Sequence, residues 1–245
     1  IRFLSAVSHD VLQPMNAARL FASSLHGRKD AEEMRNLADK IDSSLQAAEE
    51  LLDGLLDISH LDAGALKPEL SAFDGRALLE DLLQQYKPIA KRRELSLRLY
   101  MPPLMLYSDA SLLRRVLQNF ISNALRYTHK GRILIAGRRR GEQVELQVWD
   151  TGQGIPPHHL QHIYTEFHRF DQEFDWGERG MGLGLSICQR IAFLLNHSLS
   201  VDSTLGKGSV FSITVPLATT EQQQQAKRPR AIINPQHNLQ GLRVL

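Results

Sequence analysis

The stretch SLLRRVLQNFISNALRYT, residues 111–128, has apolar residues at the three- and four-residue spacing of an amphipathic helix. On the face beside this apolar stripe, Asn119, Asn123 and Arg126 follow at spacings of four and three residues. Asparagine is a poor residue for a helix interior, so two on one face call for an explanation. Their amide oxygens suit a hydrated magnesium ion, and the arginine suits phosphates. An ordinary solvated face is the alternative interpretation.

A second polar cluster follows the strand predicted at 143–149, in which apolar and polar residues alternate. The strand leads into Asp150, Gly152 and Gly154. A carboxylate at a strand end, followed by glycines that let a ligand approach the backbone, is typical of a binding loop. Hairpin turns use the same residues, so this cluster alone is a weak signal.

Three glycines, Gly180, Gly182 and Gly184, open the helix predicted at 182–196. A helix N-terminus exposes N–H groups and a positive dipole end, which favour a polyphosphate. The cluster has neither the Lys-Ser/Thr of a P-loop nor the buried strand that leads into a dinucleotide fingerprint. A further cluster, Gly206-Lys207-Gly208-Ser209, is typical of a structural hairpin turn when taken alone.

Around these clusters, residues 74–217 mix helix and strand patterns. Helices are predicted over 74–92, 109–128 and 182–196, and strands over 95–100, 104–107, 132–139, 143–149, 198–202 and 209–215. Tight turns at 130–131 and 141–142 favour a largely antiparallel sheet. We therefore expect an α+β region built as a two-layer α/β sandwich, with the helices on one face of the sheet.

Residues 1–62 are different, because they show two helical stripes separated by a break at 26–30, with Asp30 as a candidate N-cap. Two antiparallel helices of this length cannot bury both stripes in each other. A second copy solves this, so we expect a dimeric four-helix bundle. The chain is thus predicted to be multi-domain, α followed by α+β.

His9 lies in the first of these helices, roughly opposite its apolar stripe. Gln13 shares the outer face, and Pro14 is expected to kink the helix just after the histidine. A histidine beside a helix irregularity is suggestive. On this observation alone, an accidentally solvated histidine is the favoured interpretation.

The remaining segments are predicted to be connections. Residues 63–73 lose the helical period and are predicted to be a linker, and 218–238 are polar and are predicted to be a flexible linker. Residues 239–245, which end in GLRVL, are typical of the first strand of a further domain. Both ends therefore suggest a fragment of a longer polypeptide.

Composition excludes several functions. A net charge of +2, from 29 basic and 27 acidic side chains, does not indicate a nucleic-acid binder. No apolar run approaches the roughly 18 residues that span a membrane, so no membrane contact is expected. The single cysteine, Cys188, is expected to be a buried inert thiol and suggests a reducing, cytoplasmic location for this fragment.

The order and spacing of the clusters are far more specific than each cluster alone. The series from Asn119 through Asp150 and the 180–185 glycines to the 206–211 turn resembles the ATP-binding domain of sensor histidine kinases. That domain has the Bergerat-type fold and belongs to the GHKL superfamily, with gyrase, the ninety-kilodalton heat-shock chaperone and mismatch-repair ATPases. The run EFHRF at 166–170 resembles the kinases' phenylalanine box. Ser8-His9-Asp10 with Pro14 resembles their phosphoacceptor box on a dimerisation hairpin.

The resemblance implies the cofactors ATP and Mg²⁺ and a role for each matched residue. His9 is the implied nucleophile, Asp10 hydrogen-bonds the ring or takes its proton, and Gln13 stands where relatives orient a water. Asn119 is implied as the Mg²⁺ ligand. The implied nucleotide contacts are Asn119, Asn123, Arg126, Tyr127, Asp150, Gly152, Gly154, Ile155, Phe170, Gly180, Gly182, Leu183, Gly184, Leu185 and Ser209.

Two departures from the family pattern matter. Arg126 stands where a lysine is usual, so a phosphate contact survives with a different geometry. The acceptor box reads His-Asp-x-x-Gln-Pro, so dephosphorylation through Gln13 stays an open question. This box looks like a subgroup often found as hybrid kinases, in which a receiver domain follows. The resemblance therefore implies a homodimer that passes a phosphoryl group to a receiver domain, in cis or in trans.

Three alternatives remain. A GHKL ATP hydrolase generally has a glutamate four residues before the second asparagine, and Asn119 at that position cannot act as a base. A non-catalytic kinase-like scaffold would show a broken acceptor or nucleotide box, and both boxes are intact. A zinc site at His158, His162 and Glu166 requires a helix between proline and glycine, so a solvated surface is favoured there.

Overall fold

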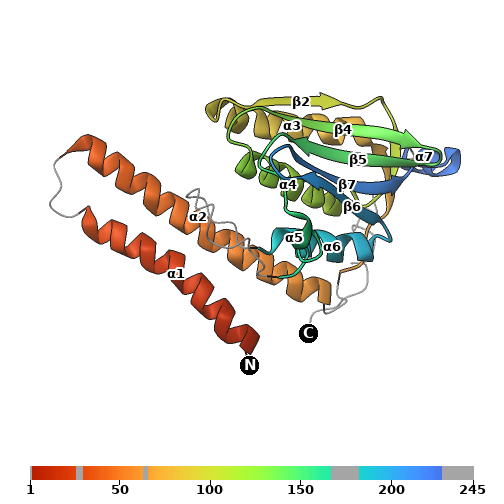
Figure 1. Cartoon of the computed structure of the whole chain (residues 1–245). Coiled ribbons are helices and arrows are strands. Elements are labelled where there is room, and N and C mark those ends of the chain that lie inside the picture. The colour runs from red at the N-terminus through yellow and green to blue at the C-terminus, as the bar shows by residue number, and fades with distance from the viewer. Residues whose placement is uncertain (1, 26–29, 63–65, 167–181, 228–245) are drawn as a thin grey trace, which may run out of the picture.

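A computed structural model describes residues 2–25, 30–62, 66–166 and 182–227. Its first part is an arm of two antiparallel helices, α1 (Arg2–Ser24) and α2 (Ala31–Asp62), which lie side by side (Figure 1). Both helices predicted from the apolar spacing are present. Asp30 caps α2, because its carboxylate accepts the backbone N–H of Glu32 at 2.9 Å.

A five-stranded sheet dominates the second part. In spatial order its strands are β2 (Ser96–Tyr100), β4 (Arg132–Arg140), β5 (Gln143–Asp150), β7 (Gly208–Pro216) and β6 (Ser198–Thr204). Only the β2–β4 pair is parallel, so the sheet is largely antiparallel, as predicted. Two short strands, β1 (Ser71–Asp74) and β3 (Met105–Ser108), form a separate antiparallel pair.

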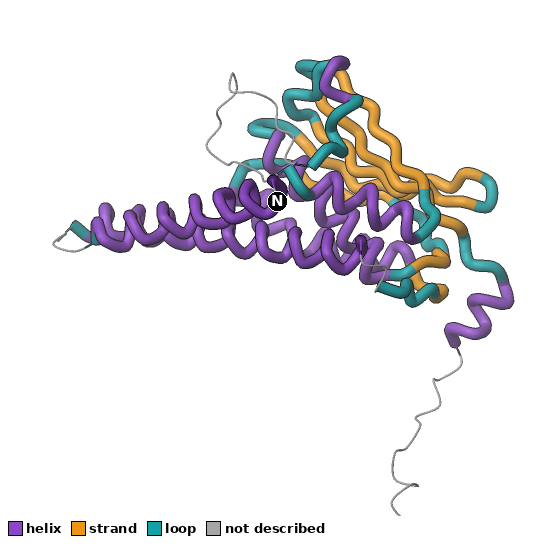
Figure 2. The backbone as a smooth tube through the Cα atoms, turned by 90° about the horizontal axis from the view of Figure 1, so that it is seen from below, coloured by secondary structure: helices purple, strands orange, loops and turns teal. Residues whose placement is uncertain are grey.

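Three helices cover one face of this sheet, and Figure 2 shows helices lying against the strands. They are α3 (Gly75–Arg92), α4 (Ala110–Tyr127) and α6 (Gly184–Leu194). Asp74 and Asp109 accept backbone N–H groups at the starts of α3 and α4, which explains where these two helices begin. The fully buried side chains between the layers include Leu82, Leu117, Phe120, Ile135, Leu146 and Ile213. The predicted two-layer α/β sandwich is confirmed.

The arm and the sandwich meet where α2 contacts α6 (Figure 1). Gly54 of α2 is buried there. A Cβ atom on this glycine would lie 3.3 Å from Cδ1 of Leu183 and 3.6 Å from Cδ1 of Ile187. The missing side chain therefore lets the first turn of α6 approach the arm closely.

The structure differs from the prediction after β7. Residues 218–238 are predicted as a flexible linker, but α7 (Thr220–Lys227) is a helix that contacts β1. A capping box explains it: Thr219 Oγ1 accepts the N–H of Gln222 at 3.3 Å, and Gln222 Oε1 accepts the N–H of Thr219 at 2.8 Å. A short helix, α5 (Pro157–Leu160), lies between β5 and α6. Among the described residues, no helix is both long and apolar enough to span a membrane.

Candidate functional site

The polar face of α4 forms one wall of the candidate site. The helix buries its apolar stripe completely, and this leaves Asn119, Asn123 and Arg126 partly buried at its edge. The Asn119 amide donates to the carbonyl of Arg115 at 3.1 Å, so its orientation is fixed. The oxygen of that amide is thus directed away from the donor contact and stays available as an acceptor.

The start of α6 lies against this wall. A Cβ atom on Gly184 would overlap the Asn119 side-chain oxygen, so a larger residue here would displace the Asn119 amide. Leu183, which precedes α6, is buried, whereas Gly182, Gly184 and Leu185 are partly buried. The first asparagine of α4 and the N-terminus of α6, far apart in the sequence, are therefore neighbours.

Asp150, at the end of β5, forms the opposite end of the site. Its carboxylate accepts the backbone N–H of Gly152 at 2.8 Å. Burial raises the pKa of Asp150 above its ordinary value, while hydrogen bonds from the backbone N–H groups of Gly152 and Ser209 act in the opposite direction. A partly buried carboxylate with two backbone donors is well placed to accept a further hydrogen bond from a ligand.

The loop after Asp150 is packed too closely for side chains at its two glycines. A Cβ on Gly152 would overlap the carbonyl oxygen of Tyr127, at the end of α4, and one on Gly154 would overlap the carbonyl oxygen of Thr204. Gly154 also has a φ of 70°, in the left-handed region. Ile155 follows as a buried residue, whereas Tyr127 is 39% exposed. The loop thus packs against both the end of α4 and the start of the β6–β7 turn.

The structure shows three features near this site that the sequence did not predict. The hydroxyl of Thr128, at the end of α4, is buried without a hydrogen-bond partner in the described part of the chain. Glu166 forms an ion pair with Arg190 of α6 and so ties the segment after α5 to that helix, with 2.6 Å between Oε1 and Nη2. The hydroxyl oxygen of Ser203 lies 2.9 Å from that of Ser209. Each link depends on tertiary proximity, so no local pattern could reveal it.

Some predicted residues lie outside the described part. Phe170 and Gly180 fall in 167–181, which the structure does not describe. His9 and Asp10 lie on α1, and only the helical backbone is described at these two positions. Gln13, one turn further along α1, is exposed. The predicted nucleotide contacts that are described therefore cluster at one end of the sandwich, and the acceptor box lies on the arm.

The described residues fit a nucleotide and its metal. Glycines 152, 154 and 184 stand where a side chain would overlap the protein's own atoms, so backbone groups line the cluster. The polar groups that could contact a ligand are a carboxylate, two amides, an arginine and the N-terminus of α6. Thr128 adds a hydroxyl without a hydrogen-bond partner in the described residues. Amide oxygens are hard ligands that suit Mg²⁺, and a helix N-terminus suits phosphate.

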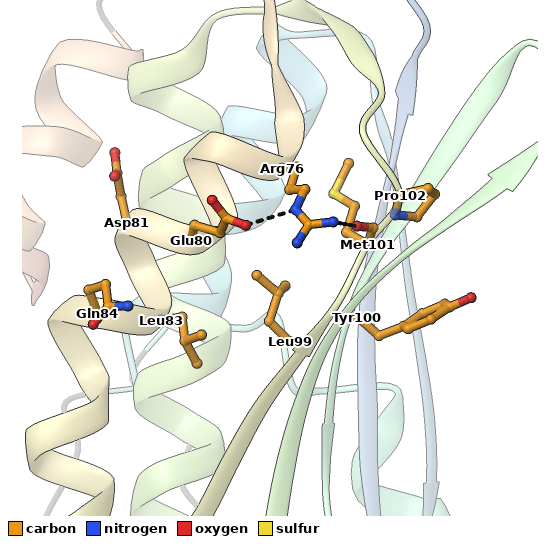
Figure 3. Close-up of a pocket in the computed structure, with 9 residues that line it drawn as sticks. All are labelled: Arg76, Glu80, Asp81, Leu83, Gln84, Leu99, Tyr100, Met101 and Pro102. Carbon is orange, nitrogen blue, oxygen red and sulfur yellow. Dashed lines mark hydrogen bonds and ion pairs between the residues drawn. The ribbon is translucent and has the colours of Figure 1, made fainter.

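Two hollows lie in the described part of the chain. One, of about 680 Å³, lies between α3 and β2, and there Arg76 contacts Glu80 and the carbonyl oxygen of Met101 (Figure 3). The other, of about 460 Å³, lies along β4–β7 and reaches Asp150, Ser203 and Ser209 of the candidate site. The rest of its lining mixes Arg138, Arg140 and Lys207 with Glu145 and Asp202. Neither contains the amide pair of α4. Cys188 is buried, as predicted, and burial raises the pKa of its thiol.

Two family models match the chain. Residues 1–64 match the His Kinase A (phospho-acceptor) domain, and residues 108–219 match the histidine kinase-, DNA gyrase B-, and HSP90-like ATPase. The first match contains the arm and His9. The second contains α4, the Asp150 loop, α6 and the β6–β7 turn.

Known proteins agree with these matches. The sensor protein TorS of Escherichia coli (strain K12) is 33% identical over 253 residues, which cover 99% of this chain and 26% of TorS. The sensor histidine kinase RcsC of the same strain is 28% identical over 218 residues, 88% of this chain and 23% of RcsC. The solved structure of the Acinetobacter baumannii histidine kinase AdeS superposes with a TM-score of 0.68 at 20% identity, covering 86% of this chain and 98% of that one.

At 20% identity, the likeness to AdeS shows the fold alone. This chain spans about a quarter of the length of RcsC and of TorS. The two family matches, in the order of arm and sandwich, carry the assignment. The chain belongs to the sensor histidine kinases and contains their phosphoacceptor domain followed by their ATP-binding domain.

Proposed function

We propose that the chain is an ATP-dependent protein-histidine kinase that phosphorylates His9 and passes the phosphoryl group to an aspartate of a receiver domain. The observation that carries the proposal is the juxtaposition of Asn119 with Gly184. It places an amide oxygen beside the N–H groups of a helix N-terminus, where the terminal phosphates of a nucleotide and their metal would bind. The match to the ATPase family supports ATP as the nucleotide.

In this proposal the nucleotide lies across the end of the sandwich. The Asp150 carboxylate accepts a hydrogen bond from the adenine amino group. The glycine-lined loop 152–155 and Ser209 surround the base. Asn123 and Arg126 follow Asn119 along α4 toward its C-terminus, where Tyr127 lies beside the loop. The amides and the arginine bind phosphate oxygens. Phe170 and Gly180 are proposed to complete the site.

Asn119 and its neighbours would hold Mg²⁺, which neutralises charge on the phosphates as the terminal group is transferred. A neutral imidazole nitrogen of His9 attacks the γ-phosphorus, a P–N bond forms, and the bond to the leaving ADP breaks. Asp10 hydrogen-bonds the other ring nitrogen or takes its proton. Gln13, exposed one turn further along α1, would orient a water if the kinase also dephosphorylates its receiver domain.

The arm supports a dimer in this scheme. Met15, Leu45 and Leu52 are exposed on the apolar stripes of α1 and α2 in a single chain. A second arm would cover such side chains and complete a four-helix bundle. We therefore propose a homodimer, with the acceptor histidines on its outer surface.

We propose this division of the chain: residues 1–62 form the dimerisation and phosphoacceptor hairpin, 63–73 a linker, and 74–217 the ATP-binding domain. Residues 239–245 would begin a receiver domain, as in a hybrid kinase. The segment between them, 218–238, would be a connection that contains α7.

The decisive experiment is incubation of the chain with γ-labelled ATP and magnesium. We expect an acid-labile, base-stable label that is lost in His9→Gln and retained in His158→Gln, the control at an exposed histidine. Undiminished labelling of His9→Gln would place the acceptor elsewhere. Release of phosphate without any protein label would favour the hydrolase alternative, and nucleotide binding without either reaction would favour a scaffold.

A further inference from the structure

Ser203, in β6, is a hydrogen-bonding hub beside the nucleotide site. It lies directly opposite Ser209 of β7 in the strand register. Its hydroxyl oxygen lies 2.7 Å from the backbone nitrogen of Ile155, 3.1 Å from the carbonyl oxygen of Gly208 and 2.9 Å from the hydroxyl oxygen of Ser209. One side chain therefore joins the loop after Asp150, the β6–β7 turn and Ser209.

The chemistry of the three partners restricts the direction of each bond. The N–H of Ile155 can only donate and the carbonyl of Gly208 can only accept, whereas a hydroxyl donates once and accepts twice. All three contacts are satisfied when Ser203 donates to Gly208 and accepts from Ile155 and from Ser209. The Ser209 proton is then engaged, and its oxygen is left as an acceptor.

Ser209 is also connected to the carboxylate at the base end of the site. Its backbone N–H donates to Asp150, and a Cβ on the preceding Gly208 would overlap the Asp150 carbonyl oxygen. Ser209 is 6% exposed, so its hydroxyl is shielded from bulk water. The arrangement thus places two acceptors close together, the Asp150 carboxylate and the Ser209 hydroxyl oxygen.

We propose that Ser203 is a positioning residue that makes the site select a 6-aminopurine over a 6-oxopurine, an inference that rests on the proposed nucleotide function. Adenine offers two N–H donors on its 6-amino group, whereas guanine offers an acceptor oxygen there. Two acceptors match the amino group and oppose the oxygen, because a desolvated acceptor without a donor is costly. Without Ser203, the Ser209 hydroxyl is free to turn its proton toward the base.

The test measures equilibrium binding of ATP and GTP to the whole chain in the presence of magnesium. In Ser203→Ala we expect about tenfold weaker binding of ATP, the size of one lost charged or buried hydrogen bond, without a matching loss for GTP. The preference for ATP therefore falls about tenfold. The rate of autophosphorylation at saturating ATP should change less than about twofold, because Ser203 does not touch the reacting atoms.

The controls separate positioning from folding. Ser200→Ala removes an exposed hydroxyl from the same strand and should bind both nucleotides as the wild type does. Ser203→Thr keeps the hydroxyl and should keep the preference for ATP. A Ser203→Ala/Ser209→Ala double variant should lose no more ATP affinity than Ser209→Ala alone, because Ser203 acts through Ser209.

Several results would overturn the inference. Equal losses for ATP and GTP in Ser203→Ala would show a purely structural residue, and an unchanged preference would show that Ser209 needs no positioning. If Ser203→Ala fails to fold, Ser203→Thr decides. Loss of the preference for ATP in this variant, which keeps the hydroxyl, would show that the Ser203 hydroxyl does not set the preference. A wild-type chain that binds no ATP would instead overturn the proposed nucleotide site and, with it, this inference.

Discussion

The arm and the sandwich differ in how far they bury their apolar side chains. In the sandwich, leucines and isoleucines of α4, β4, β5 and β7 are fully buried between two layers of the same chain. On the arm, Met15 is 49% and Leu52 is 48% exposed, and the described arm residues that are buried are the small ones Ala18, Ala48 and Gly54. The sandwich has its own core, whereas the arm presents an apolar surface.

This difference assigns separate tasks to the two parts. A binding site with glycines in close contact requires a rigid frame, and a core covered on both sides provides one. An apolar helical surface instead gains stability when a second copy covers it. Changes in the sandwich core should therefore affect folding of one chain, and changes on the arm should affect association.

Phe120→Ala should have the largest effect, because it would lower the free energy of unfolding of the sandwich. Phe120 is fully buried on α4, with its ring centroid 5.5 Å from that of Phe211. Removal of a buried phenylalanine costs about 3–5 kcal/mol, which approaches the whole stability of a typical domain. Chemical denaturation should show this loss, and ATP binding should weaken in parallel.

The matched control for this variant is Phe193→Ala, on α6, because Phe193 is 89% exposed. Exposed positions usually change stability by less than about 0.5 kcal/mol. If Phe193→Ala destabilised the chain as much as Phe120→Ala does, the sandwich core could not be the source of the difference.

Leu45→Glu should break the dimer of arms and leave the sandwich intact, because Leu45 is exposed on the apolar stripe of α2. A leucine side chain contributes about 1.5–3 kcal/mol when buried, and a dimer would lose this contribution twice. We expect the dimer dissociation constant to rise by at least about a hundredfold, measured by analytical ultracentrifugation, while each chain keeps its affinity for ATP. Ser43→Glu, at an exposed position on the other side of α2, adds the same single negative charge and is the control. A wild-type chain that sediments as a monomer would contradict the proposed bundle.

Gly184→Ala should weaken nucleotide binding without unfolding the sandwich. The added methyl group would overlap the Asn119 oxygen and displace the amide that we propose as the metal ligand. We expect about tenfold weaker binding of ATP with magnesium, equal to about 1.4 kcal/mol, and little change in melting temperature. Gln189→Ala, at an exposed position of α6, should bind normally. Normal binding by Gly184→Ala would argue against Asn119 as a ligand.

The sequence predicted the elements of the sandwich well because each has a local cause. The stripe of α4, the alternation in β5 and the glycines before α6 are visible in single windows of the sequence, and the structure places all three where expected. The helix α7 was missed because a glutamine run is also typical of linkers. Its capping box at Thr219 and Gln222 was the available signal.

Ser203 could not be found in the same way. It is one of several serines in β6, and nothing in its neighbours in sequence distinguishes it from Ser198 or Ser200. Its role depends on the β6–β7 register, which places it opposite Ser209. The contact between Asn119 and Gly184 likewise depends on how α4 and α6 pack. Tertiary register, rather than local propensity, decides these parts of the site.

The smallest predicted effect concerns the pH dependence of the sandwich. His197, after α6, is partly buried, and its Nε2 lies 2.8 Å from the hydroxyl oxygen of the fully buried Ser108. Burial lowers the pKa of His197 below its ordinary 6.5, against the opposite effect of a backbone hydrogen bond at Asn196. The unfolded chain therefore binds this proton first, so stability is full above about pH 7 and is lost as the pH falls through 6.5 toward the lowered pKa.

His197→Gln removes this titration and keeps a polar partner for Ser108. Between pH 7.5 and pH 5.5 the free energy of unfolding, measured in urea, should therefore fall less in His197→Gln than in the wild type. His158→Gln, at an exposed position on α5, serves as the control for a change of histidine number. An equal fall in His197→Gln and the wild type would mean that this buried histidine does not set the acid sensitivity of the sandwich.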